Sequence, residues 1–336
     1  MPKHVQIVIY GSGGAMTSNA FAKKLIFHPF QRSSRMNYQN AWPGCCQIAG
    51  CLKSSYIEVG SGACRPRRRN PDLETSSFGD IKLSTPFALD GQTVLVTGAS
   101  SGLGRHFSLT LAKAGAKVAV CARRTEKLAS LVEEIETFDG RAMAFAMDVA
   151  DVTSIAAAVD AAETELGPIS VLVNNAGISV QKSAVDMTPE DYDTLMDTNQ
   201  KGAYFTAVEV GKRMIAHGHG GSIINIASVA SLRPLAQLST YCMSKAAVSH
   251  MTRALAVEWA RYNVRVNAIA PGYIETEMNS EYFASDHGQS FVKRFLRRRV
   301  GVPENLDGAL MLLATQAGEF MTGEQIVVDD GLNLAM

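Results

Sequence analysis

The sequence predicts a doubly wound α/β fold, with one parallel sheet of seven strands and helices on both faces. From Gln92 onward, short apolar runs alternate with stretches whose apolar residues recur at three- and four-residue spacing, as strands and their covering helices do. The apolar runs alternate little with polar residues, which indicates strands buried on both faces of a parallel sheet. We therefore expect crossover helices on each side of the sheet.

Seven apolar runs are candidate strands. They are Thr93–Thr97, Lys117–Cys121, Ala142–Met147, Ser170–Asn174, Ser222–Ala227, Arg265–Ile269 and Gln325–Val328. Helical patterns include Leu103–Ala114, Thr125–Thr137, Val152–Leu166 and Thr240–Arg261. No linker rich in Pro, Gly or Ser interrupts this region, so we predict a single domain over residues 85–336. Its substrate site should be built from loops at the strand ends.

Residues 1–84 differ in composition from the rest of the chain. They hold 11 Lys+Arg and 4 Asp+Glu, with no acidic residue before Glu58. We predict a poorly ordered N-terminal extension or a targeting segment, and a wrongly assigned start codon is the alternative. The expected location is cytoplasmic, or mitochondrial if this extension includes a transit peptide.

Cysteine usage and charge exclude several function classes. Four of the six cysteines lie in the extension, at Cys45, Cys46, Cys51 and Cys64. They complete no recognised zinc-finger spacing, so we expect reduced thiols and no metal site. The remainder holds 21 Lys+Arg and 28 Asp+Glu, which is not the basic surface of a nucleic-acid binder. No apolar stretch approaches the roughly 18 residues of a membrane span.

A glycine-rich turn follows the first candidate strand and precedes a helical pattern. Residues 97–104 read Thr-Gly-Ala-Ser-Ser-Gly-Leu-Gly. Gly98 permits a tight turn, Gly102 lets the backbone approach a pyrophosphate, and Gly104 lets the helix pack closely. The helix N-terminus adds free N–H groups and a favourable dipole. A dinucleotide cofactor fits this arrangement.

The spacing G-x-x-x-G-x-G resembles that of the short-chain dehydrogenase/reductase family, and further motifs of the family follow at matching intervals within residues 90–331. They are Asp148-Val149, Asn174-Asn175-Ala176-Gly177, Asn199, Ser228, Tyr241 with Lys245, and Pro271-Gly272 with Ile274 and Thr276. The resemblance implies a Rossmann-type fold and a nicotinamide-dependent oxidoreductase. It implies cofactor contacts from Gly98, Ser100, Ser101, Gly102, Leu103, Gly104, Asp148, Val149, Asn175, Ala176, Gly177, Tyr241, Lys245, Pro271, Gly272, Ile274 and Thr276.

Four residues are expected to carry the chemistry. Tyr241 and Lys245 are four apart in a predicted helix, so both side chains lie on one face. The ammonium should favour the phenolate and lower the tyrosine pKa from about 10. The resemblance implies that Tyr241 exchanges a proton with the substrate oxygen, Ser228 orients that oxygen and Lys245 binds the nicotinamide ribose. It also implies that Asn199 holds a water that links Lys245 to solvent.

The end of the second strand bears on the choice of nicotinamide cofactor. An enzyme that prefers NAD has a carboxylate about 20 residues beyond the glycine turn, and Ala122 stands here instead. Arg123 beside it can form a charge-assisted contact with a 2′-phosphate. We therefore predict that NADP(H) is favoured over NAD(H), and a solvated arginine pair is the alternative.

Substrate identity is expected to depend on Ile178–Asp186 and Glu277–Val300, which cover the active site in the family. The closest general resemblance is to 3-oxoacyl-acyl-carrier-protein reductases and to the sugar-acid and polyol dehydrogenases beside them. We therefore predict interconversion of a 3-oxoacyl-like ketone and a secondary alcohol, with a carrier-bound acyl chain as a possible substrate. A sugar-acid or polyol dehydrogenase is the first alternative, and a non-catalytic dinucleotide-binding regulator is the rival from another class.

Two further features bear on partners. The basic residues Lys293, Arg294 and Arg297–Arg299 suit an acidic carrier protein or a phosphate-bearing acyl chain, and a solvated or intersubunit role is equally open. Residues 328–331 read Val-Asp-Asp-Gly where the family has Asp-Gly-Gly, so the C-terminal turn should differ from that of relatives. The resemblance implies a homo-oligomer, either a tetramer or a dimer.

Overall fold

The computed structural model describes residues 86–277 and 279–335. These residues form a seven-stranded sheet of order β3-β2-β1-β4-β5-β6-β7, in which every neighbouring pair is parallel. The strands are β1 (Thr93–Thr97), β2 (Lys117–Ala122), β3 (Arg141–Ala146), β4 (Ile169–Asn174), β5 (Gly221–Ile226), β6 (Val264–Pro271) and β7 (Gln325–Val328). The predicted fold class is confirmed. The expectations for residues 1–84, including the four thiols and the targeting role, lie outside the described residues.

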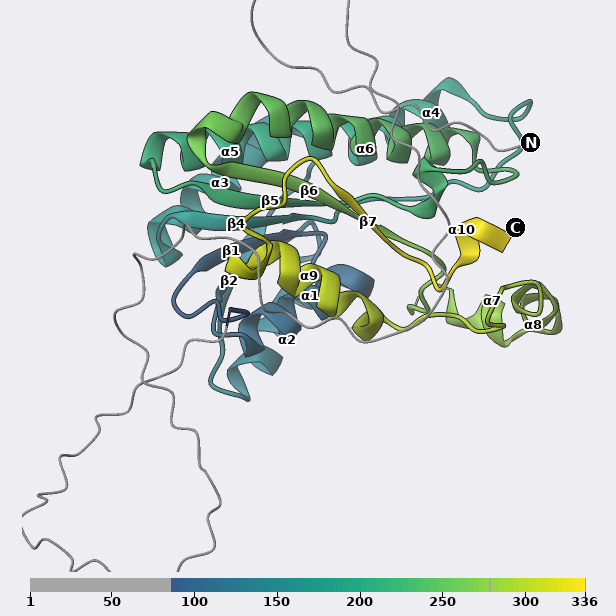
Figure 1. The fold of residues 1–336 in the computed structure, drawn as a ribbon, viewed down its shortest axis with the longest axis horizontal. Helices are drawn as coiled ribbons and strands as arrows, with labels where there is room; N and C mark the ends of the chain where they lie inside the picture. Colours follow the sequence, from purple (N-terminus) through teal and green to yellow (C-terminus); the bar gives the residue numbers. More distant parts are fainter. Residues whose placement is uncertain (1–85, 278, 336) are drawn as a thin grey trace, which may run out of the picture. The chain divides into compact units, whose positions relative to one another are not determined.

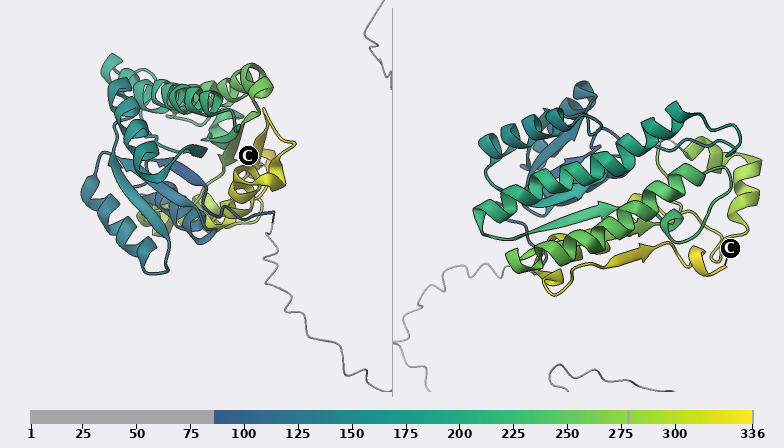
Figure 2. Two further views of the ribbon diagram at one scale, coloured as in Figure 1. Left: turned by 90° about the vertical axis from the view of Figure 1, so that its left-hand side faces the viewer. Right: turned by 90° about the horizontal axis from the view of Figure 1, so that it is seen from above.

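Helices cover both faces of the sheet (Figure 1). One layer consists of α1 (Gly102–Lys113), α2 (Thr125–Glu136) and α9 (Asp307–Ala314), and the other of α3 (Val152–Leu166), α5 (Ala203–His217) and α6 (Ser239–Trp259). Seen from above, the helices of the second layer run side by side over the strands (Figure 2). The two-sided burial inferred from the apolar runs is therefore present.

Strand β1 shows how the sequence fills both layers. Its five residues are all buried. Leu95 packs into the core beneath α3, α5 and α6, whereas Val94 and Val96 pack into the core beneath α1, α2 and α9. Successive side chains of a strand point to opposite faces, so a continuous apolar run supplies both cores.

Shorter elements connect these layers or lie beyond the strand ends. They are α4 (Pro189–Met196), a π-helical turn η1 (Asp197–Gly202), the 3₁₀ turns η2 (Val229–Ser231), η3 (Ala260–Tyr262), η4 (Pro303–Leu306) and η5 (Gln316–Gly318), and the helices α7 (Ser280–Ala284), α8 (Asp286–Val292) and α10 (Leu332–Ala335). Helices α7, α8 and α10 lie beyond the carboxyl ends of β6 and β7 (Figure 1). No helix within the described ranges is both long and apolar enough to span a bilayer.

The order of the strands positions the candidate site. The chain passes from β1 outward to β2 and β3 and then returns to place β4 on the other side of β1. The loops that leave β1 and β4 therefore diverge, which opens a crevice outside their carboxyl ends. All seven carboxyl ends lie along the same edge, since every strand pair is parallel.

Candidate active site

Thr97, the last residue of β1, joins the loops that diverge there. Its Oγ1 accepts hydrogen bonds from the backbone N–H groups of Asn175 and Ala176, both at 3.0 Å. The side chain of Asn175 returns a bond from Nδ2 to the Thr97 carbonyl oxygen at 2.9 Å. The side-chain amide of Asn175 therefore holds the start of the glycine turn in place, while its backbone N–H is bound to Thr97.

The three glycines of the turn have three distinct surroundings. Gly98 has a φ of +67°, and a Cβ there would lie 2.9 Å from the Ala176 Cα. A Cβ on Gly104 would lie 2.5 Å from the Asn175 Nδ2 and would strike the Gly98 carbonyl, so α1 can pack here only without a side chain. Gly102 has a φ of +54°, and a Cβ there would meet only the Thr276 side chain, at 3.8 Å.

The N-terminus of α1 is open toward this edge. The helix begins at Gly102, and its N-cap residue Ser101 makes no side-chain capping bond. The first N–H groups of a helix lack intrahelical partners, and the helix dipole favours an anion beside them. A close backbone approach and unused donors together form a cradle suited to a pyrophosphate.

The two arginines after β2 differ from what the sequence led us to expect. Arg123 is largely exposed, and its guanidinium lies 4.0 Å from the Asp148 carboxylate. Arg124 instead reaches back over the glycine turn, where Nη2 donates to Ser100 Oγ at 2.8 Å and to Ser101 Oγ at 2.9 Å. Arg124 is therefore a candidate cofactor residue that sequence reasoning missed. Its only signal was its position beside Arg123.

Asp148 and Val149 follow β3 at the same edge. The Asp148 carboxylate accepts from the Ala150 N–H at 3.1 Å, whereas the helix cap of α3 is Asp151, which accepts from the Thr153 N–H at 2.9 Å. Asp148 is therefore not the cap of that helix. Val149 is buried beneath the π-helical turn, where a Cβ on Gly202 would lie 2.7 Å from its carbonyl oxygen.

Asn199 lies in that π-helical turn and is almost fully buried. Its Oδ1 accepts from the Ile178 N–H at 2.7 Å, and its Nδ2 donates to the Ile178 carbonyl at 2.9 Å and to Ser244 Oγ at 3.1 Å. The side chain thus clamps the loop after β4 to helix α6. π-Helical turns recur at functional sites because they shift a residue out of the regular helical register.

Lys245 lies beside this clamp. Its ammonium donates to the Ile226 carbonyl oxygen at 2.8 Å, and it lies 5.8 Å from the centre of the Tyr241 ring. A Cβ on Gly177 would be 3.2 Å from Asn199 Oδ1 and 3.5 Å from Lys245 Nζ, so all three groups converge. Burial lowers the pKa of Lys245 to about 8, because a buried ammonium loses its hydration.

Tyr241 lies in the first turn of α6, and its hydroxyl is within hydrogen-bonding reach of Ser228. Ser228 follows β5 and caps η2 by accepting from the Ala230 N–H at 3.1 Å. The expected lowering of the Tyr241 pKa is wrong for this structure. Burial raises the pKa of Tyr241, Ser228 opposes the rise, and Cys242 and Tyr273 add to it. Desolvation of the phenolate is therefore the dominant influence on this tyrosine.

The loop after β6 lies at the same edge as the glycine turn and approaches it at Thr276, whose side chain would be 3.8 Å from a Cβ on Gly102. Pro271 ends the strand, and a Cβ on Gly272 would lie 2.8 Å from the Asp329 Cα. Ile274 forms an isolated bridge with Gly301. The Asn279 side chain then fixes the loop, because Oδ1 accepts from the Thr276 N–H at 2.7 Å and Nδ2 donates to the Ile274 carbonyl at 2.9 Å.

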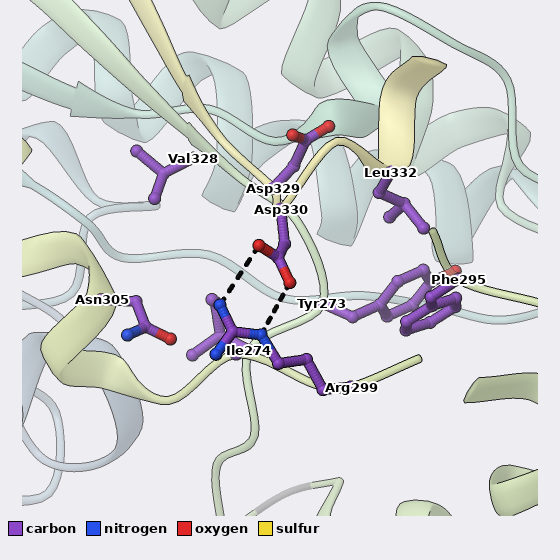
Figure 3. A pocket seen from close by; sticks show the side chains of 10 residues that line it. Tyr273, Ile274, Phe295, Arg299, Asn305, Val328, Asp329, Asp330 and Leu332 are labelled. Atoms are coloured by element: carbon purple, nitrogen blue, oxygen red, sulfur yellow. Dashed lines mark hydrogen bonds and ion pairs between the residues drawn. The ribbon is translucent and has the colours of Figure 1, made fainter. Parts of the chain in front are cut away.

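A small cavity lies between this loop and the end of β7 (Figure 3). Its lining includes Tyr273, Ile274, Phe295 and Leu332. On one side the Asp330 carboxylate accepts from Arg299 Nε at 2.7 Å and from Arg297 Nη1 at 2.7 Å. Asp330 has a φ of +55°, a conformation that favours glycine.

These ion pairs account for part of the basic run that the sequence analysis singled out. Arg297 and Arg299 are bound to the C-terminal turn of the same chain, at the position where the family pattern has glycine. The aspartate that departs from the pattern thus serves as the partner of both arginines. Among residues 86–277 and 279–335, no cluster of three or more His, Cys, Asp or Glu side chains could hold a metal.

The chain has many relatives among known proteins. A family model described as short chain dehydrogenase matches residues 92–287. The chain is 36% identical over 246 residues to a 2-dehydro-3-deoxy-D-gluconate 5-dehydrogenase of Dickeya dadantii, which covers 73% of this chain and 96% of the relative. It is also 36% identical over 244 residues to a 3-oxoacyl-[acyl-carrier-protein] reductase of Thermotoga maritima, which covers 73% and 98%.

Solved structures agree with these sequence matches. One is the crystal structure of a gluconate 5-dehydrogenase from Burkholderia cenocepacia in complex with NADP and tartrate. It superposes with a TM-score of 0.72 at 36% identity, and the match covers 75% of this chain and 99% of that chain. The similarity therefore spans nearly the whole of these relatives and about three quarters of this chain.

Proposed function

The chain belongs to the short-chain dehydrogenase family, and on that premise we propose that it oxidises a secondary alcohol of a sugar acid, or reduces the matching ketone, with a nicotinamide cofactor. That it is a dehydrogenase acting on alcohol groups follows from its relatives. The observation that best supports the site is the convergence of Ser228, Tyr241 and Lys245 at the carboxyl edge of the sheet.

The residues of this edge fit a dinucleotide. The glycine turn would collide with any Cβ at Gly98 or Gly104, and the first N–H groups of α1 are open beside it. When bound, the nicotinamide supplies the hydride acceptor or donor. The protein would contribute the pyrophosphate cradle at Gly98–Gly104, the ribose contact at Lys245, and the loop from Pro271 to Thr276.

Proton transfer falls to Tyr241. Because burial raises its pKa, its hydroxyl is protonated near neutral pH and is ready to donate to a carbonyl oxygen during reduction. The Ser228 hydroxyl would hold that same oxygen. Lys245, with a pKa of about 8, is mostly protonated at neutral pH and would restore the proton through the ribose.

The side chain of Asn199 was expected to hold a water, but in the structure it has a different role. Its amide is fully engaged by Ile178 and Ser244. We therefore assign any water that it holds to its main-chain groups in the π-helical turn. The side chain acts as a clamp that fixes the distance between the loop after β4 and helix α6.

For the substrate class, the comparisons favour the alternative over the first reading. Two of the relatives described above bear the names of sugar-acid dehydrogenases, whereas one is a 3-oxoacyl reductase. The pairing of Arg297 and Arg299 with Asp330 also leaves these two arginines less able to meet an acidic carrier. We therefore place a sugar acid first and a 3-oxoacyl thioester second.

The central test replaces Tyr241 with Phe. The ring still packs against its neighbours, but the transferable proton is lost, so turnover should be abolished while cofactor affinity stays nearly unchanged. Turnover is measured with a panel of sugar acids, polyols and 3-oxoacyl thioesters in both directions, and affinity by quenching of protein fluorescence. Residual turnover within about tenfold of wild type would contradict the assignment.

Preference for NADP(H) is the second part of the proposal. Arg124 is held on the two serine hydroxyls and Arg123 stands beside Asp148, so both can meet a 2′-phosphate. Losing a charge-assisted bond to that phosphate should cost roughly 1.5–3 kcal/mol. The ratio of kcat/KM for NADPH and NADH is compared in Arg123→Ala and Arg124→Ala, with the exposed Arg141→Ala as the control. An unchanged ratio in both variants would refute the preference.

A homo-oligomer, either a dimer or a tetramer, completes the proposal. Strand β7 is an edge strand, and Val327 on it and Phe320 before it are exposed. Apolar side chains at an open sheet edge favour pairing with a second copy. Light scattering on the eluting protein tests this, and a monomer at micromolar concentration would contradict it.

A further inference from the structure

Arg233 is the charged residue that stands out in the segment between the two catalytic hydroxyls. It follows Ser228 by five residues and precedes Tyr241 by eight. Its backbone N–H donates to the Val229 carbonyl at 3.1 Å, so one helical turn relates the two residues. Residues four apart on such a turn lie on the same side, and Arg233 therefore projects from the side of the segment that Val229 occupies.

That side faces the cover of the active site. Val229 packs in a small core with Phe283, Val292, Phe295 and Leu332, and Tyr273 packs against this core. The Arg233 guanidinium donates to the Leu332 carbonyl oxygen at 3.3 Å. Leu332 in turn lies close to Phe295 and Tyr273 around the cavity at the end of β7 (Figure 3).

Electrostatics agree with this placement. The charge of Arg233 acts to lower the pKa of Tyr273, against a larger rise caused by burial, and Tyr273 in turn acts on the pKa of Tyr241. The geometry agrees, because Arg233 is bound to Leu332 and Tyr273 packs against the small core that contains Leu332. An anion held by Arg233 would lie on the substrate side of the catalytic tyrosine.

The other basic residues of the covering segments are paired or exposed. Lys182 forms an ion pair with Asp191, and Arg297 and Arg299 are bound by Asp330. The remaining ones, Lys293, Arg294 and Arg298, are exposed. Arg233 is half-buried, and within the described ranges it forms no ion pair and one hydrogen bond. A guanidinium has five N–H donors, so most of them are available to a ligand.

We propose that Arg233 determines substrate specificity by binding a carboxylate at the end of the substrate away from the reacting carbon. A guanidinium matches a carboxylate in two parallel hydrogen bonds, and a partly buried one binds it more strongly than an exposed one. The substrate is then a hydroxy acid rather than a neutral polyol. This inference rests on the proposed function and names the anion that the site takes.

The test uses substrates matched in carbon skeleton that differ only at one end, such as D-gluconate and D-glucitol, with further acid and polyol pairs of four to six carbons. Wild type should oxidise the acids with the higher kcat/KM. Arg233→Ala should lower kcat/KM for the acids roughly tenfold or more and change that for the polyols little. Arg233→Lys keeps the charge and should retain part of the preference, and Arg253→Ala, at an exposed arginine of α6 outside the covering segments, should leave it unchanged.

Other outcomes separate this inference from the proposed function. An equal loss for acids and polyols in Arg233→Ala, or a wild-type preference for polyols, overturns the carboxylate role while the dehydrogenase assignment stands. If wild type oxidises neither class, the proposed function fails, and the carboxylate role of Arg233 is then tested by ligand binding without turnover. The thermal midpoint of the NADP-loaded protein should then rise with gluconate but not glucitol, and only while Arg233 is present. No rise in wild type overturns the inference.

Discussion

Lys245 carries its charge where little water reaches it. Among residues 86–277 and 279–335 its ammonium donates to the Ile226 carbonyl alone, and burial lowers its pKa from 10.5 to about 8. Between these pH values the unfolded chain binds a proton that the folded protein does not bind. The free energy of unfolding therefore rises with pH across this window on account of Lys245. The raised pKa of Tyr241 acts in the opposite direction above about pH 10, so a difference measurement is needed.

We predict that Lys245→Met removes this rise. Urea unfolding of the cofactor-free protein is followed from pH 7 to 10 in wild type and in the variant, and the difference in unfolding free energy is plotted against pH. The difference should shift in favour of wild type as the pH passes 8. Lys212→Met, at an exposed lysine, is the control. A flat difference for Lys245→Met would show that the ammonium is better solvated than its surroundings indicate.

At the level of single residues, the sequence predicted where the site residues lie better than it predicted their pKa shifts or the orientation of their side chains. The convergence of Ser228, Tyr241 and Lys245 follows from the end of the apolar run of β5 and from a four-residue helical spacing, both of which are local patterns. The pKa of Tyr241 and the orientation of Arg124 were not predictable in the same way. Burial depends on what packs above a residue, and the direction of a loop side chain depends on acceptors such as Ser100, 24 residues away.

Elements show the same division. Every strand lies within two residues of its predicted range, because apolar runs bounded by polar turns are local signals. The π-helical turn η1 has no counterpart among the helical patterns named from the sequence. It is stabilised by the contacts of Asn199 with Ile178 and Ser244. These partners come from two other parts of the chain, so the sequence pattern of residues 197–202 does not by itself predict a π-helical turn.

Helix α1 offers a prediction that separates packing from helix propensity. Gly104 is the third residue of α1, where a Cβ would strike the Gly98 carbonyl, whereas Gly308 is the second residue of α9, where a Cβ would meet open space. Gly104→Ala should destabilise the protein by roughly 1–3 kcal/mol, since the added methyl overpacks the turn, and should abolish NADP binding. Gly308→Ala should be neutral or stabilise the helix by up to about 1 kcal/mol.

Urea unfolding and equilibrium titration with NADP measure both effects in the glycine variants. Both substitutions are Gly→Ala in the first turn of a helix, one position apart in helical numbering, so a large difference between them reports the contact at Gly104. If Gly104→Ala binds NADP as wild type does, the glycine turn is not the pyrophosphate cradle.

For the whole molecule, the extent of the domain is the prediction to test. Every candidate cofactor and catalytic position lies after Gln92, and strand β1 begins at Thr93. A chain that begins at Ser84 should therefore fold and turn over substrate at the full-length rate. Thermal midpoints and kcat are compared at equal protein concentration. A large loss of either upon truncation would place residues 1–84 within the folded enzyme.

The parallel sheet also sets when the protein can first work during its synthesis. The glycine turn at Gly98 and the Pro271-Gly272 loop that faces it are separated by more than 170 residues of chain. At a translation rate of about 5–20 residues per second, roughly 10–35 s pass between the synthesis of the two sides. Until β4 has been synthesised, the edge of β1 that will pair with it is open to other chains. A ribosome-bound chain that stops before β6 should therefore depend on a chaperone and bind no NADP.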